Sequence, residues 1–89
     1  MAERFAIRLS KSAEKFLYKL PAKQFKQITT KIFSLQIEPR PQDCKLLKGQ
    51  EGLYRVDQGE YRIIYEITDD TIEVFRVGKR NDDEVYENL

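Results

Sequence analysis

Residues 53–77, LYRVDQGEYRIIYEITDDTIEVFRV, decide the fold of this 89-residue chain, because apolar and polar side chains alternate along them between two polar breaks. Alternation with a period of two is typical of strands that bury one face. The breaks, Gln58-Gly59 and Asp69-Asp70, consist of residues that form tight turns between antiparallel strands. The segment therefore predicts an antiparallel meander of three strands, at residues 53–57, 61–68 and 71–77.

The N-terminal part of the chain predicts one further strand and two helices. Residues 4–9 largely alternate, with Phe5, Ile7 and Leu9 on one side. Ser10 is a good helix N-cap and precedes a first apolar stripe with helical spacing. Pro21 either ends this helix or opens the next, and a second stripe extends to about Ile37. The two stripes are Ala13, Phe16, Leu17 and Leu20, then Phe25, Ile28, Ile32 and Leu35.

These elements predict a single α+β domain over residues 1–89. An N-terminal strand and a helical hairpin precede a loop from Cys44 to Gly52, and the meander follows. The strands form one sheet with the helices on one of its faces. The chain is long enough for one hydrophobic core and too short for two.

Composition narrows the chemistry that is available. The chain has no histidine and a single cysteine, Cys44, which excludes an internal disulfide, a Ser-His or Cys-His nucleophile and the usual histidine-containing zinc sites. No apolar run approaches the ~20 residues of a membrane span, and the N-terminus lacks the apolar stretch of a signal peptide. We therefore expect a cytoplasmic protein with no membrane association.

The charged residues are unevenly distributed although the net charge is only +1. Twelve of the sixteen lysines and arginines lie between Arg4 and Arg55, whereas acidic residues gather towards the C-terminus. Local basic patches are therefore compatible with the small net charge.

The turn positions determine which residues face one another. An Asp69-Asp70 turn pairs Tyr65 with Val74, Ile63 with Arg76 and Arg62 with Val77. A Gln58-Gly59 turn places Arg55 opposite Arg62, whereas a Gly59-Glu60 turn places Asp57 opposite Arg62 and makes an ordinary salt bridge. One sheet face is then apolar and suited to lie under the helices: Tyr54, Val56, Tyr61, Ile63, Tyr65, Ile67, Ile72 and Val74, with Arg76 at its end. The other is mixed: Arg55, Arg62, Ile64, Glu66, Glu73, Phe75 and Val77.

The arginines of the mixed face are candidates for a phosphate site. Arg55 and Arg62 repel each other if they are paired, and an anion would relieve this repulsion. Arg80 follows the last strand closely and can reach the same place, and planar guanidinium groups match phosphate oxygens. The alternative is that Arg55 and Arg62 are solvated, or neutralised by Asp57 and Glu66.

Other side chains have both a functional and a structural interpretation. Lys45 and Lys48 in the loop, and Lys79 beside Arg80, can track a nucleic-acid backbone or can simply be solvated. Tyr86 can stack on a base or exchange a proton, or it can anchor the C-terminal tail. The helical aromatic residues fit a core or a partner surface better than a base-stacking platform: Phe16, Phe25 and Phe33.

Several motifs together resemble the RelE/ParE toxin superfamily. They are Gly52-Leu53-Tyr54-Arg55, Gly59-Glu60-Tyr61-Arg62-Ile63-Ile64-Tyr65, Arg76-Val77-Gly78-Lys79-Arg80 and Glu84-Val85-Tyr86, with Lys45-Leu46-Leu47-Lys48-Gly49 before them. The resemblance covers nearly the whole chain. Gly78-Lys79-Arg80 followed by Tyr86 favours the RelE branch.

The resemblance implies a toxin of a type II toxin-antitoxin system. A RelE-type toxin is an endoribonuclease without metal or cofactor that cuts messenger RNA in the ribosomal A site. A RelB-type antitoxin silences it, and operator DNA is contacted only through the antitoxin. The alternative in the same superfamily is a ParE-like toxin that inhibits DNA gyrase and has no nuclease activity.

The resemblance also assigns the candidate catalytic residues. Arg62, Arg80 and Tyr86 match the functional positions of the family, and Arg55 replaces a lysine. Asp57 stands where well-described members carry a second lysine, which leaves the identity of the proton acceptor open.

Overall fold

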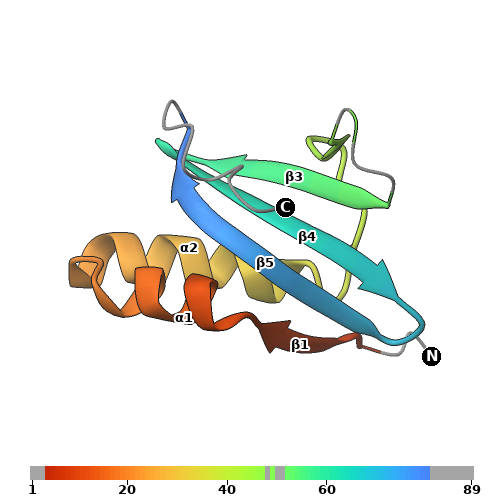
Figure 1. The fold of residues 1–89 in the computed structure, drawn as a ribbon, viewed down its shortest axis with the longest axis horizontal. Helices are drawn as coiled ribbons and strands as arrows, with labels where there is room; N and C mark the ends of the chain where they lie inside the picture. The colour runs from red at the N-terminus through yellow and green to blue at the C-terminus, as the bar shows by residue number, and fades with distance from the viewer. Residues whose placement is uncertain (1–3, 48, 50–51, 81–89) are drawn as a thin grey trace.

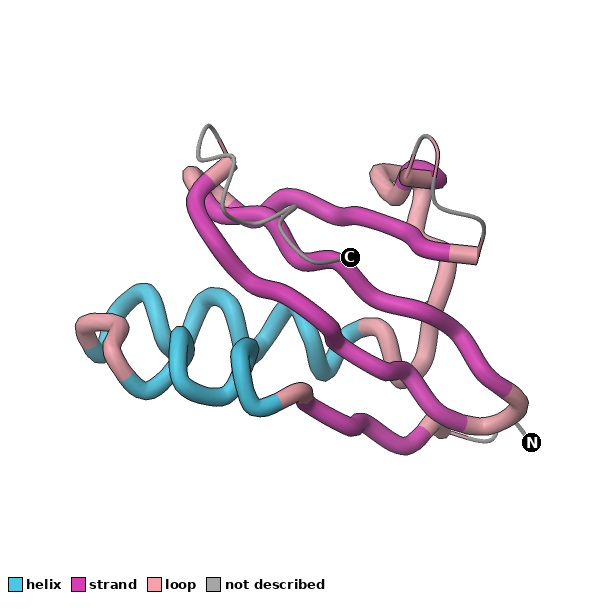
Figure 2. Tube along the Cα trace, in the orientation of Figure 1, coloured by secondary structure: helices cyan, strands magenta, loops and turns pink. Residues whose placement is uncertain are grey.

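The computed structural model describes residues 4–47, 49 and 52–80. Its elements are strand β1 (Ala6–Leu9), helices α1 (Lys11–Tyr18) and α2 (Ala22–Ser34), and strands β2 (Lys45–Leu46), β3 (Leu53–Gln58), β4 (Tyr61–Thr68) and β5 (Thr71–Lys79). The strands form one open sheet in the order β1-β5-β4-β3-β2. Helices α1 and α2 form a hairpin that covers one face of this sheet (Figures 1 and 2).

The predicted α+β class and the antiparallel meander of β3, β4 and β5 are confirmed. Strand β1 pairs with β5 in parallel, so the N-terminal strand forms one edge of the sheet. Strand β2 forms the other edge, where a loop was predicted. A strand of two residues is too short to show a period in the sequence, which is why the alternation did not reveal it.

Ser10 joins the first strand, the first helix and the last strand. Its Oγ accepts a hydrogen bond from the backbone N–H of Ala13 at 3.0 Å, which is the predicted N-cap. The same hydroxyl donates to the carbonyl oxygen of Phe75 at 2.6 Å, and the Ser10 N–H donates to the carbonyl of Val74 at 2.9 Å. This short side chain therefore fixes the start of α1 against the sheet. Pro21 precedes the first residue of α2, so it opens the second helix.

The core lies between the hairpin and the sheet. Both predicted apolar stripes reach it through Ala13, Leu17, Ile28, Ile32 and Leu35. The sheet contributes Val56, Ile63, Tyr65, Ile72, Val74 and Val77, with Tyr54, Tyr61 and Ile67 packed at the margin. The predicted apolar face is therefore confirmed except at its last position, where Val77 replaces Arg76.

A β-bulge accounts for this exchange. The register runs as predicted from Thr68 opposite Thr71 to Tyr65 opposite Val74, and then shifts so that Ile64 lies opposite Arg76. The predicted pairs of Ile63 with Arg76 and of Arg62 with Val77 are wrong, because the bulge inserts Phe75 and reverses the faces beyond it. Arg76 instead donates from Nη1 to the Oγ of Ser12 at 3.1 Å, while Val77 enters the core.

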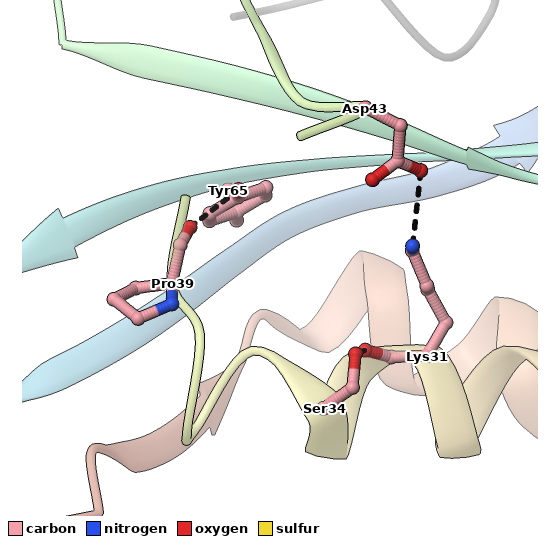
Figure 3. Close-up of polar contacts among 5 residues, drawn as sticks. All are labelled: Lys31, Ser34, Pro39, Asp43 and Tyr65. Atoms are coloured by element: carbon pink, nitrogen blue, oxygen red, sulfur yellow. Dashed lines mark hydrogen bonds and ion pairs between the residues drawn. The ribbon is translucent and has the colours of Figure 1, made fainter. Parts of the chain in front are cut away.

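The connection between α2 and β2 is attached to the sheet by buried Tyr65. The Tyr65 hydroxyl donates to the carbonyl of Pro39 at 2.7 Å, and Lys31 in α2 forms an ion pair of 3.0 Å with Asp43 (Figure 3). The rings of Tyr65 and Tyr54 stack with centroids 5.7 Å apart. Burial raises the pKa of the Tyr65 phenol far above its usual range, so this group remains a neutral hydrogen-bond donor.

We expect Tyr65→Phe to lower the free energy of unfolding by about 1 to 3 kcal/mol, because the Pro39 carbonyl loses its donor while the ring stack remains. Urea unfolding followed by circular dichroism measures this loss. Tyr18→Phe removes a hydroxyl from a residue that is 75% exposed and serves as the control, with no comparable loss. Equal stability of the two variants would contradict the role of the Tyr65 hydrogen bond.

Candidate functional site

The candidate site begins with an ion pair between Asp57 on β3 and Arg62 on β4. The two strands are joined by a Gly59-Glu60 turn, with Gly59 at a φ of +61°, and this turn places Asp57 opposite Arg62. The Nε of Arg62 lies 2.8 Å from Oδ1 of Asp57, and Nη2 lies 3.4 Å from Oδ2. The register with Arg55 opposite Arg62 is therefore wrong and the alternative salt bridge is confirmed. In the observed register the attractive pair of Asp57 and Arg62 replaces the repulsive pair of Arg55 and Arg62.

Arg55 and Arg80 lie close to this ion pair. Arg55 is two residues before Asp57 on β3, so both project from the sheet face away from the helices. The backbone N–H of Arg80 donates to the carbonyl of Glu60 at 2.7 Å, which holds the end of β5 against the β3–β4 turn. The end of β3, the start of β4 and the end of β5 meet at the left of the sheet in Figure 1. Three arginines, one on β3, one on β4 and one directly after β5, thus gather around one carboxylate.

The electrostatics of Asp57 reflect this surrounding positive charge. The hydrogen bond from Arg62 lowers the pKa of the Asp57 carboxyl below its usual value, and the charges of Arg62, Arg55 and Arg80 act in the same direction. Partial burial opposes them without reversing the shift. Asp57 is therefore an anion at neutral pH.

This shift predicts a pH dependence of stability. Because the pKa of Asp57 is lower in the folded chain than its ordinary value of 3.8, the ion pair stabilises fully above that value. The contribution is lost as the pH falls through the folded-state pKa. Since Asp57 is 39% exposed, we expect Asp57→Asn to cost about 0.5 to 1 kcal/mol at pH 7.

Urea unfolding of wild type and Asp57→Asn over a pH series tests this expectation. The difference in unfolding free energy should disappear in strongly acidic solution, where the wild-type carboxyl is protonated as well. A difference that stays constant with pH would show that the substitution acts through packing instead.

A small apolar cluster lies beside the arginines on the same face of the sheet. Ile64 is fully buried and packs with Leu53, Leu47 and Phe75. Ile64 also lies opposite both Arg55 and Arg76 in the register. The stem of Arg55 therefore starts beside this apolar cluster.

The remaining RNA-binding candidates occupy different positions. Lys45 is exposed on β2 and pairs with Arg55, so two cations lie opposite each other at this edge. Sequence periodicity did not predict that Lys45 lies next to Arg55, because β2 is too short to show a period. Lys79 is exposed at the end of β5, opposite Tyr61. Lys48 and Tyr86 lie outside the described residues.

The helical hairpin carries a second surface feature, an apolar groove. Three exposed aromatic side chains of the helices line it: Tyr18, Phe25 and Phe33, which are 75%, 36% and 57% exposed. Leu9, Leu17, Glu14 and Thr29 complete its lining. The chain carries six lysines and one glutamate from Lys11 to Ser34, so the groove lies in a strongly basic segment.

Two further properties concern residues 4–47, 49 and 52–80. No group of three or more cysteine, aspartate and glutamate side chains among them is arranged to hold a metal ion. None of the helices found there has the length and apolar character needed to cross a bilayer.

Comparison with known protein families identifies the family to which this chain belongs. The family model described as the ParE toxin of type II toxin-antitoxin systems, parDE, matches residues 7–84. The chain belongs to this toxin family. Curated protein sequences give no match.

Solved structures of RelE toxins share the fold of this family member. The RelBE2 toxin-antitoxin complex from Mycobacterium tuberculosis matches with a TM-score of 0.76 and 29% identity, over 92% of this chain and 98% of the other. The RelB-RelE complex from Methanococcus jannaschii matches with a TM-score of 0.70 and 30% identity, over 90% and 98%. The isolated RelE toxin of E. coli matches with a TM-score of 0.75 and 26% identity, over 92% and 90%. The protein is thus a RelE-like toxin of a type II toxin-antitoxin system.

Proposed function

We propose that this toxin is a ribosome-dependent endoribonuclease that cleaves messenger RNA without a metal ion and thereby inhibits translation in the cytoplasm. The observation that carries the proposal is the gathering of Arg55, Arg62 and Arg80 at one end of the sheet. Lys45 beside Arg55 adds positive charge at the neighbouring edge. Such a cluster suits the phosphate that lies between two nucleotides.

The proposed reaction is an in-line attack of the ribose 2′-hydroxyl on the adjacent phosphorus. The 2′-oxygen forms a bond to phosphorus while the bond to the 5′-oxygen breaks, which leaves a 2′,3′-cyclic phosphate and a 5′-hydroxyl. Arg62 and Arg55 stabilise the charge that grows on the phosphorane oxygens, and such preorganised donors are often the largest contribution to catalysis. Arg80 donates a hydrogen bond to the departing 5′-oxygen, which takes its proton from water.

Tyr86 completes the proposed catalytic set by orienting the substrate or accepting the proton of the 2′-hydroxyl. Lys45, Lys48 and Lys79 contact the RNA backbone on either side of the scissile bond. The histidine-free sequence offers no general base of pKa near neutrality, so a freely diffusing RNA is a poor substrate. A ribosome that holds the message in the reactive geometry supplies the missing positioning, which is worth several kcal/mol.

Mapping RNA 5′ ends in ribosome-bound messages after induction of the toxin tests the nuclease. We expect new 5′ ends with wild type, and a loss of cleavage of about 100-fold or more with Arg62→Ala or Arg80→Ala, since each removes a donor to the reacting phosphate. Tyr86→Phe should also reduce cleavage. Arg8→Ala removes an exposed arginine that pairs with Glu73 and should cleave like wild type.

A ParE-like inhibitor of DNA gyrase is the second candidate, favoured by the name of the family model that matches the chain. The same induction experiment distinguishes the two functions. Intact messages together with gyrase-trapped DNA breaks would replace the nuclease by the gyrase inhibitor.

We also propose that a RelB-type antitoxin binds this toxin and provides its only contact with operator DNA. The apolar groove of the hairpin offers a docking surface for an amphipathic segment of the antitoxin. The excess of lysines along the same helices favours a segment rich in acidic residues.

Phe33→Asp tests this docking surface, because it places a charge inside the apolar groove. We expect its affinity for the antitoxin, encoded by the gene next to the toxin gene, to fall by about 100-fold or more, as for a central interface residue. Leu46→Asp alters another exposed apolar residue, on β2 and outside the groove, and is the matched control. Calorimetry with the purified antitoxin gives both affinities, and equal affinities would contradict docking in the groove.

A further inference from the structure

Asp57 occupies a position from which it competes with phosphate for Arg62. Its two carboxylate oxygens face the Nε and Nη2 atoms of the guanidinium, at 2.8 and 3.4 Å. This edge is one that arginine uses for two-point contacts with carboxylates and phosphates alike. A phosphate that approaches along the same edge therefore meets an anion already bound there.

The accessibility of the pair strengthens this competition. The Arg62 side chain is only 14% exposed, whereas the Asp57 side chain is 39% exposed. The carboxylate is thus the more accessible member of the pair. Gly78, on the other side of Arg62 in the register, adds no side chain. Of these two neighbours, Asp57 obstructs a ligand that approaches Arg62 more than Gly78 on β5 does.

The charge balance of the cluster points the same way. Arg55, Arg62 and Arg80 all act on Asp57, so the four side chains carry a net charge of +2 instead of +3. One unit of negative charge a few ångströms from a bound phosphate weakens the binding of that phosphate by about fivefold in water and by more at a partly buried site. Asp57 therefore holds Arg62 in place and at the same time lowers the affinity of the cluster for anions.

We propose that Asp57 is an internal counter-ion that holds the phosphate-binding edge of Arg62 in the free toxin and is displaced when an RNA phosphate binds. The inference rests on the proposed function, because it assigns this edge to the scissile phosphate. Asp57 is a positioning residue in this scheme and takes no proton from the RNA. The chain thus favours RNA delivered at high local concentration, as on a ribosome, over RNA that diffuses freely.

Binding measurements on the purified full-length chain test the proposal without requiring cleavage. The probes are inorganic phosphate and an RNA trinucleotide whose 2′-hydroxyls are methylated, so that attack on phosphorus is blocked. We expect Asp57→Asn to bind both about tenfold more tightly at constant ionic strength, which corresponds to about 1.4 kcal/mol. Asp57→Glu keeps the charge and should stay near wild type.

The matched control is Asp69→Asn, the same replacement in the exposed β4–β5 turn at the opposite end of β4. It changes the net charge equally and should leave both affinities unchanged. In an Arg62→Gln background, Asp57→Asn should have less than a twofold effect, because the competition requires the guanidinium. An equal gain with Asp69→Asn, or a gain that persists without Arg62, would overturn the proposal.

Nuclear magnetic resonance of the wild-type chain provides a test that does not depend on how the variants fold. The Nε–H signal of Arg62 should shift as inorganic phosphate is added, because its acceptor changes from carboxylate to phosphate. A signal that stays in place at saturating phosphate would refute the displacement of Asp57. If these binding results hold while the wild type fails to cut ribosome-bound messages, the counter-ion role stands and the nuclease proposal fails.

Discussion

The pairing of β3 with β4 is the constraint on which the other features depend. Side chains along a strand alternate between two faces, so the register decides at once which residues enter the core and which surround the charged site. With Asp57 opposite Arg62, Val56 and Ile63 face the helices together. The same register places Arg55 and Asp57 on the other face. A shift by one residue would bury charges and expose the core, so folding and site assembly share one determinant.

The two faces of the sheet have separate tasks. The face beneath α1 and α2 contains the large buried side chains and carries most of the stability, since apolar burial is the dominant favourable contribution to folding. Among the residues that the structure describes, the other face carries a small apolar cluster around Ile64 together with the arginines. Charged side chains near a phosphate site cost little stability there. This division explains how such a short chain can hold a dense positive cluster beside a well-packed core.

The net charge of the chain is small, but two of its regions are strongly basic. One is the arginine cluster around Asp57, and the other is the lysine-rich helical hairpin with its apolar groove. They differ in chemistry: planar guanidinium groups suit phosphate, whereas an apolar groove on a lysine-rich hairpin suits an acidic amphipathic peptide. This difference supports the proposal that RNA and an antitoxin bind at separate surfaces. Local arrangement, and not total charge, determines what each surface binds.

The sequence by itself determined the elements and their class. The period of two in residues 53–77, the Ser10 cap and the two helical stripes are local signals, and local physics is enough to read them. The motifs around Arg62 and Arg80 likewise identified the superfamily. The Gln58-Gly59-Glu60 stretch allowed two registers, and one of them places Asp57 opposite Arg62.

Only the tertiary structure decided between those registers, because the energies of cross-strand pairs depend on residues that are distant in the sequence. It also revealed the bulge at Phe75, which exchanged Arg76 for Val77 in the core, and the short strand that brings Lys45 next to Arg55. A bulge and a two-residue strand leave no periodic trace in the sequence. Both arise where hydrogen bonding and packing across the sheet outweigh local alternation, and both affect the surroundings of the candidate site.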